Sequence, residues 1–127
     1  MEVEVWRSFW PKKAPLTEQN LSDQAGKVFI VTGASSGVGE KLAQILYQHN
    51  ATIYVATRSE KKTNEAIARI KKDFQLSKGT LVFLHLDLGD LTTIKTSALA
   101  YLAREATLDT IWLNAGVMFP PQGSKTV

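Results

Sequence analysis

The sequence predicts an α/β fold, with a doubly wound parallel sheet of about four strands and three helices. Short apolar runs rich in β-branched residues alternate with amphipathic segments, and a glycine-rich turn separates the first run from the segment that follows it. Such runs are typical of parallel strands that are buried on both faces. Because strand and helix alternate, we expect right-handed crossovers and the strand order 3-2-1-4.

The predicted strands and helices follow one another from residue 27 onward. The strands are Val28–Val31, Thr52–Ala56, Leu81–Leu86 and Thr110–Leu113. The first helix follows the glycine-rich turn, the second is capped by Ser59 and ends near Asp73, and the third begins at Asp90. Residues at helical spacing predict the inner faces of these helices: Leu42, Ile45, Leu46 and His49; Ala66, Ile67 and Ile70; Leu91, Ile94, Ala98, Tyr101 and Leu102.

The chain divides into three predicted parts. Residues 1–26 carry two prolines and no sustained periodicity, which indicates an irregular leader. Residues 27–119 form the nucleotide-binding half-domain, and residues 120–127 form a loop. We expect the leader aromatics Trp6, Phe9 and Trp10 to pack on the surface of the domain, with a small membrane or partner contact as the alternative.

Composition excludes several classes of protein. The formal charge of +3 is too small to indicate a nucleic-acid partner. The absence of cysteine excludes disulfides, thiolate zinc sites and a cysteine nucleophile, and His49 and His85 are expected to be structural. We expect no membrane span and no signal peptide, so the cytoplasm is the default location. Acids and bases are mixed in the second predicted helix, which favours a solvated face over a basic patch with a partner: Glu60, Lys61, Lys62, Glu65, Arg69, Lys71, Lys72 and Asp73.

The glycine-rich turn between the first strand and the first helix predicts a phosphate-binding site. It contains Gly33, Gly37 and Gly39, together with Ser35, Ser36 and Val38. Glycine permits a tight exit from the strand, close approach of main chain to a phosphate, and close packing of helix on strand. The helix N-terminus supplies free amides and a positive dipole end. No lysine follows the last glycine, which excludes a P-loop and favours a dinucleotide.

Arg58 predicts which dinucleotide is bound. It ends the second strand, 19 residues after Gly39, where an acidic residue would normally accept hydrogen bonds from a ribose. Arginine cannot accept these bonds, but it can pair with a 2′-phosphate. Lys62, one helical turn later, adds positive charge or is simply solvated. We therefore expect NADP(H) to be the cofactor.

Three ordered motifs resemble the short-chain dehydrogenase/reductase family: the run from Thr32 to Gly39, the pair Asp87–Leu88, and Leu113–Gly116 with the sequence Leu-Asn-Ala-Gly. The resemblance covers about residues 26–119. It is greatest to the retinol-dehydrogenase-like branch, several fungal members of which carry a similar leader with tryptophan and proline. It implies a Rossmann-like fold and an NAD(P)-dependent oxidoreductase, in fungi often of secondary metabolism or of lipid-like alcohol oxidation.

The resemblance also implies roles for individual residues. Asp87 would contact the adenine amino group, with the main chain of Leu88 helping. Asn114 would stabilise the central sheet and, with Ala115 and Gly116, border the adenine-side ribose. The residues alone leave simpler alternatives open, because Asp87 could begin a turn and Asn114 could cap a strand. In favour of a site, polar residues at the carboxyl ends of parallel strands face the ligand crevice.

The family's catalytic serine and its Tyr-x-x-x-Lys pair are not found in this sequence. Residues four positions after Tyr47, Tyr54 and Tyr101 are alanine, arginine and glutamate. As written, the truncated chain is therefore expected to transfer no hydride, and a carbonyl or alcohol would be a substrate only of a longer product. The alternatives are a non-enzymatic NADP-binding or partner-binding paralogue and a product without function. The fourth strand would form an open edge that favours self-association or a partner.

Overall fold

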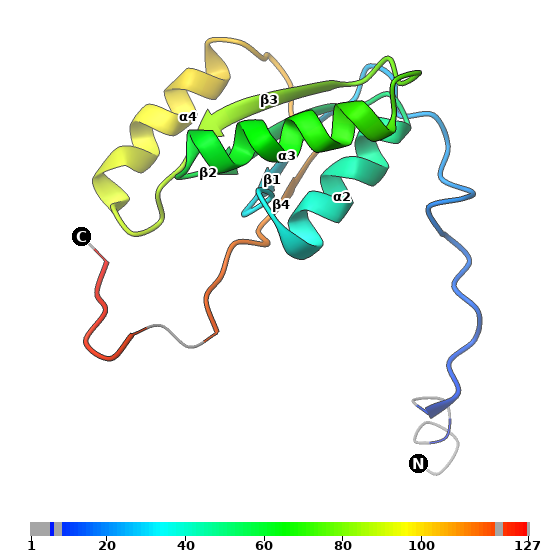
Figure 1. Ribbon diagram of the computed structural model, residues 1–127, viewed down its shortest axis with the longest axis horizontal. Coiled ribbons are helices and arrows are strands. Elements are labelled where there is room, and N and C mark those ends of the chain that lie inside the picture. The colour runs from blue at the N-terminus through cyan, green and yellow to red at the C-terminus, as the bar shows by residue number, and fades with distance from the viewer. Residues whose placement is uncertain (1–5, 7–8, 119–120, 127) are drawn as a thin grey trace.

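Four parallel strands form a single sheet with the order β3-β2-β1-β4, which confirms the predicted topology (Figure 1). The computed structural model describes residue 6 and residues 9–118 and 121–126. In this part of the chain the strands are β1 (Val28–Thr32), β2 (Thr52–Thr57), β3 (Thr80–His85) and β4 (Thr110–Trp112). β1 is buried throughout because it lies between β2 and β4 and is covered on both faces.

Helices cover the two faces of the sheet. α2 (Gly37–Gln48) and α3 (Glu60–Asp73) pack on one face, where the core contains Val31, Ile53 and Val55. The short 3-10 helix η1 (Leu91–Thr93) leads into α4 (Ile94–Leu102), which packs on the opposite face through Tyr101. The two layers of helix around one sheet are those of the predicted doubly wound fold.

The local signals for α3 are confirmed, whereas those for α4 are only partly correct. The Ser59 hydroxyl accepts a hydrogen bond from the Lys62 amide and α3 ends at Asp73, as predicted. Asp90 caps η1 rather than α4. On α4, Ser97 and Tyr101 are buried, while Leu102 is 65% exposed. Leu91 and Ala98 are also exposed. The predicted inner face was therefore wrong in part, because α4 turns Ser97 and Tyr101 to the sheet.

In α2 the predicted stripe is shifted as well. Leu46 is buried as expected, but Ala43 and Tyr47 are the other buried residues of the helical face. His49 lies at the C-cap, and its Nε2 atom is 2.9 Å from the Glu18 carbonyl oxygen. The contact links the helix end to the leader, which is a structural role for this histidine.

β4 forms an open edge of the sheet, as the sequence predicts. It is hydrogen-bonded to β1 alone among the described strands. Ile111 is 46% exposed, and Leu113, just beyond the strand, is 81% exposed. Apolar side chains and unpaired main-chain groups therefore lie together at this edge.

The leader is hydrogen-bonded to the domain at Glu18, Asp23 and Gln24. The Gln24 amide donates to the His49 carbonyl at 2.7 Å, and the Asn50 side chain donates to Asp23 at 3.0 Å. The hydrogen bond from Asn50 is the main reason why the pKa of Asp23 is lowered. Residues 11–15 run away from the domain (Figure 1).

The expectation that the leader aromatics pack on the domain was wrong. Trp6, Phe9 and Trp10 are 63%, 71% and 70% exposed and contact one another instead. Trp6 and Phe9 have helical backbone. A hydrogen bond from the Trp10 amide to the Trp6 carbonyl, at 3.0 Å, keeps these two residues close together at the far end of the leader.

Candidate cofactor-binding site

The turn after β1 is built around a close approach between two main-chain segments. Gly33 has a φ of +67°, in the left-handed region that favours glycine. A Cβ atom there would lie 2.8 Å from Cα of Ala115, so no larger residue fits without moving the segment after β4. The Gly33 amide also donates to the Ala56 carbonyl in β2 at 3.0 Å. The turn therefore holds β1, β2 and the segment after β4 together.

The N-terminus of α2 is open to solvent and has no side-chain cap. The helix begins at Gly37, which has a φ of +59°, and the Ser36 hydroxyl does not bond to the first-turn amides. A Cβ atom on Gly37 would meet no atom within 4 Å, so the space in front of it is free. The amides of the first helical turn have no intrahelical acceptor. Ser35 and Ser36 hydroxyls likewise bond to no residue that the structure describes.

Gly39 lies on the inner side of the same turn. A Cβ atom there would lie 2.6 Å from Nδ2 of Asn114 and 2.8 Å from the Gly33 carbonyl oxygen. The exposed neighbour Val38 points away from this contact, with 78% of its side chain accessible. Gly39 therefore allows α2 to pack directly on the loop, as predicted from its position in the motif.

Thr32 joins the glycine turn to the segment after β4, a role that the motifs of the sequence do not assign. Its buried hydroxyl donates to the Trp112 carbonyl at 3.2 Å and accepts from the Ala115 amide at 3.0 Å. The Asn114 side chain donates to the Thr32 carbonyl at 3.2 Å. The signal that could have identified Thr32 is a small hydroxyl residue at the end of a buried strand. Gly116 follows in open space, since a Cβ atom there would meet no atom within 4 Å.

Arg58 is exposed directly after β2, and Lys62 is exposed on the first turn of α3. Within residues 9–118, the ion pair that the structure gives is between Arg69 and Glu40, at 3.0 Å. The side chains of Arg58 and Lys62 therefore have no carboxylate partner in this region. An arginine that the protein leaves unpaired at the end of a strand remains available to an external anion.

Two buried threonines fix the segment that carries Arg58. Thr63 donates to the Ser59 carbonyl at 2.9 Å, and the hydroxyls of Thr57 and Thr63 are hydrogen-bonded to each other. Thr63 is fully buried. The backbone on both sides of Arg58 is thus held in place while its side chain stays free. The sequence does not single out this pair, because Thr57 and Thr63 look like ordinary strand and helix residues.

Asp87 forms a turn after β3, which is the simpler of its two predicted roles. Its Oδ1 atom accepts a hydrogen bond from the Gly89 amide at 2.8 Å. Its Oδ2 atom bonds to no described residue, so one oxygen remains free to accept from a ligand. Leu88, which follows, is 44% exposed.

All these residues follow strands of one parallel sheet and therefore lie along the same edge of it. The edge combines open helix amides, two free serine hydroxyls and an unpaired arginine. Such groups suit an anionic ligand that extends across the point where the strand order reverses, between β1 and β4. The glycine positions leave room for a diphosphate, so the residues present fit a dinucleotide.

The comparison with protein families supports the same conclusion over most of the chain. Residues 27–126 match the family described as short chain dehydrogenase. The chain belongs to this family.

Curated relatives are fungal short-chain dehydrogenases. The short-chain dehydrogenase/reductase pkfC of Emericella nidulans is 54% identical over 118 residues, which are 93% of this chain and 38% of that protein. A short-chain dehydrogenase/reductase of Phomopsis amygdali is 49% identical over 122 residues, 96% of this chain and 36% of that protein. The chain thus spans little more than a third of the length of these relatives.

Two solved structures share the fold. A metagenomic short-chain oxidoreductase in complex with NADP is 29% identical, with a TM-score of 0.66 over 76% of this chain and 42% of that chain. L-Sorbose reductase from Gluconobacter frateurii, complexed with NADPH and L-sorbose, is 23% identical, with a TM-score of 0.64 over 74% of this chain and 35% of that chain.

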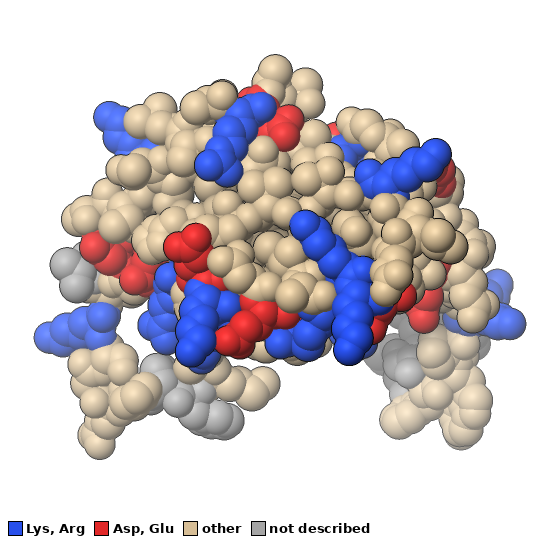
Figure 2. All heavy atoms as spheres, turned by 45° about the horizontal axis from the view of Figure 1, so that its top comes forward, with Lys and Arg blue, Asp and Glu red and all other residues tan. Residues whose placement is uncertain are grey.

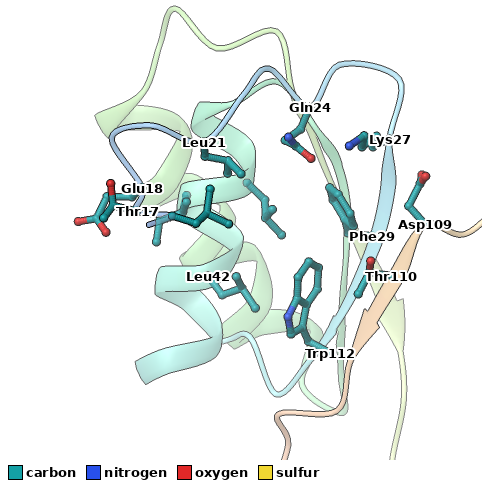
Figure 3. A pocket seen from close by; sticks show the side chains of 13 residues that line it. Thr17, Glu18, Leu21, Gln24, Lys27, Phe29, Leu42, Asp109, Thr110 and Trp112 are labelled. Carbon is teal, nitrogen blue, oxygen red and sulfur yellow. The ribbon is translucent and has the colours of Figure 1, made fainter. Parts of the chain in front are cut away.

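Two cavities lie on the flanks of this dehydrogenase sheet and not at the edge just described. One, of about 560 Å³, is enclosed by the leader, α2 and β4, with Phe29, Leu42 and Trp112 pointing into it (Figure 3). The other, of about 400 Å³, lies between α4 and the sheet and is lined by Ile30, Ile111 and other apolar residues. Both adjoin the open β4 edge, so they mark apolar surface next to it.

The charges, helices and potential metal ligands of the described ranges bear on other kinds of site. Basic and acidic side chains lie beside one another on the face shown in Figure 2, as the mixed charges of α3 predict. Among the described residues, no helix has the length and apolar character needed to cross a bilayer. Nor do the residues in this part of the chain bring together three potential metal ligands of the His, Cys, Asp or Glu type.

Proposed function

We propose that this chain is the NADP(H)-binding portion of a short-chain dehydrogenase that interconverts a carbonyl compound and an alcohol. The observation that carries the proposal is the side chain of Arg58, which is exposed, free of any described carboxylate, and mounted on a segment fixed by two buried threonines. An acidic residue at this position would favour the unphosphorylated ribose of NAD(H), whereas arginine favours the 2′-phosphate. The similarity to an oxidoreductase solved with NADP supports this choice.

Each part of the sheet edge has a proposed role. The open amides of α2, with Ser35 and Ser36, bind the diphosphate, and Arg58 with Lys62 binds the 2′-phosphate. Asp87, through its free oxygen, and the main chain of Leu88 contact the adenine. A second group, Asn114, Ala115 and Gly116, borders the adenine-side ribose. When bound, NADP(H) supplies or accepts the hydride.

Proton transfer is not assigned to the tyrosines of this chain. Tyr54 lies under α4, where its hydroxyl donates to Glu105 at 2.8 Å. Burial, together with the neighbouring carboxylate, raises the pKa of Tyr54 to about 12. Tyr101 donates to the Thr107 carbonyl at 2.6 Å on the same side of the sheet. Both hydroxyls are occupied within the protein, and a high pKa makes Tyr54 a poor acid or base near neutral pH. The described residues therefore bind and orient the cofactor.

The test is a titration of the chain with NADPH and with NADH, followed by calorimetry or by quenching of tryptophan fluorescence. We expect Arg58→Ala to weaken NADPH binding by roughly 10- to 100-fold, the effect of losing charge-assisted hydrogen bonds. The same substitution should leave NADH binding almost unchanged. Arg104→Ala, at an exposed arginine next to α4, is the matched control. If Arg58→Ala weakens the binding of NADPH and NADH equally, or leaves NADPH binding unchanged, the choice of NADP(H) as the cofactor is contradicted.

A second candidate function is binding of a partner through the β4 edge without catalysis. The exposed side chains of Ile111 and Leu113 favour it, since they leave apolar surface beside unpaired strand atoms. Oxidation of NADPH by the purified chain with any aldehyde or ketone would decide against this candidate. A stable complex at this edge, formed by a chain that binds NADP(H) without turnover, would support it.

A further inference from the structure

The aromatic cluster at the far end of the leader is the largest group of exposed aromatic side chains in the described residues. Trp6 and Trp10 have ring centroids 5.5 Å apart, and Phe9 and Trp10 have centroids 6.2 Å apart. Their positions, i, i+3 and i+4, place the rings along one side of a helical turn. None of these rings is buried against the domain. A large apolar area is therefore left in water, which is unfavourable unless another surface covers it.

The type of aromatic residue and the neighbouring charges indicate what that surface is. Tryptophan is enriched at the interface between lipid and water, where its ring is buried and its N–H stays hydrated. Lys12 and Lys13 follow the cluster after Pro11 and are exposed, and the sequence places no acidic residue between Trp6 and Lys13. A cluster of aromatic rings beside lysines is complementary to a bilayer that contains anionic lipids.

The attachment of the leader leaves the cofactor edge free. His49, which lies shortly before the start of β2 at Thr52, is hydrogen-bonded to Gln24 and Glu18 of the leader. This is the amino end of the strands, whereas the cofactor-binding residues follow the carboxyl ends. Figure 1 shows the leader running from that side of the sheet away from the domain. The point where the leader is attached is therefore separate from the cofactor-binding residues.

We propose that residues 6–13 form a membrane-surface docking segment, which places the rings of Trp6, Phe9 and Trp10 among the headgroups of an anionic bilayer. The segment is too short to span the bilayer, so docking is interfacial. Lys12 and Lys13 stay at the level of the lipid phosphates and strengthen binding electrostatically. A single helical turn gives weak, reversible attachment, whose strength depends on the fraction of anionic lipid.

The experiment measures binding of the full chain to phosphatidylcholine vesicles with and without phosphatidylserine. Trp112, the remaining tryptophan, is replaced by phenylalanine so that emission reports on Trp6 and Trp10 alone. We expect a blue shift of the emission and co-sedimentation with vesicles that contain phosphatidylserine. If vesicles that contain phosphatidylserine cause neither the blue shift nor co-sedimentation, the proposal is overturned. This is also the result expected if the cluster binds a protein and not a bilayer.

Two variants and one control identify the surface. Replacing Trp6, Phe9 and Trp10 together by alanine should abolish sedimentation. The double substitution of Lys12 and Lys13 by glutamine should weaken binding by roughly tenfold or more, since each basic residue contributes about 1 kcal/mol near an anionic surface. Leu76→Ala removes a side chain that is 97% exposed on a distant loop and should change nothing. Unaltered sedimentation of the alanine variant would mean that another surface binds lipid, and it would overturn the proposal.

Discussion

The side-chain amide of Asn114 donates to the main-chain carbonyl of Thr32 at 3.2 Å, across 82 residues of sequence. The same amide nitrogen is the atom that a Cβ on Gly39 would strike. The glycine turn after β1 and the Asn-Ala-Gly segment after β4 are therefore one packed unit. Changes in either segment should affect both the stability of the sheet edge and the binding of a dinucleotide.

Gly39→Ala should destabilise the chain, although alanine is normally the better helix former. Intrinsic propensity alone would stabilise a helix by about 1 kcal/mol. Here the new methyl group would lie 2.8 Å from the Gly33 carbonyl oxygen and 2.9 Å from Cα of Ala34, so the main chain must shift. We expect a net loss of about 1–3 kcal/mol in the free energy of unfolding, measured by urea denaturation. Gly116→Ala, where a Cβ meets no atom within 4 Å, is the control and should be near neutral. A stabilised Gly39→Ala protein would refute the packing argument.

Thr32→Val should loosen the link between β1 and the segment after β4. Valine keeps the buried volume but removes the hydroxyl that donates to Trp112 and accepts from Ala115. We expect a loss of about 1–2 kcal/mol in the free energy of unfolding, together with weaker NADPH binding. Thr80→Val, at the exposed first residue of β3, is the control for the change of side chain. If the two variants unfold at the same urea concentration, the hydroxyl of Thr32 does not hold the two segments together.

Stability should fall between about pH 10 and pH 12 because of Tyr54. Burial and the hydrogen-bonded Glu105 raise the pKa of this tyrosine from 10.0 to about 12. Below pH 10 the phenol is protonated in both states, so the full stability is present. Above pH 10 the unfolded chain releases the proton before the folded chain does, which favours unfolding. Tyr54→Phe removes this contribution, so its unfolding free energy should decline less steeply over the same range. Identical slopes for the two proteins would show that Tyr54 titrates normally.

Ile111→Lys should reduce association of the chain with itself at the β4 edge. The isoleucine is 46% exposed on a strand that has one hydrogen-bonded neighbour among the described strands. A charge on an edge strand opposes pairing with another strand. We expect the parent chain to elute earlier in size-exclusion chromatography as its concentration rises, and the variant to elute at one position. Leu76→Lys is the control for an added charge at an exposed leucine. A parent chain that stays monomeric at every concentration would contradict this prediction.

The sequence determined the order of elements, the strand order and the position of the glycine-rich turn. These features depend on local patterns, since buried parallel strands are continuous apolar runs and a left-handed turn requires glycine, as at Gly33 and Gly37. The place of Arg58 after the second strand could be predicted for the same reason. Its exposure and its lack of a described carboxylate partner could not, because they depend on which side chains fold next to it.

Only the tertiary structure decided which polar groups bond across the sheet and which apolar groups stay exposed. The hydrogen bonds of Thr32 connect residues at least 80 positions apart, and no local pattern specifies them. The burial of residues in α4 is not specified by a local pattern either. Apolar residues lie around more of this helix than the sheet covers, so packing against the sheet decided which of them are buried. For Trp10, hydrophobicity predicted packing on the surface of the domain, but the path of the leader keeps its ring away from that surface. Periodicity fixes local conformation, whereas burial and long-range bonding depend on how the assembled elements meet.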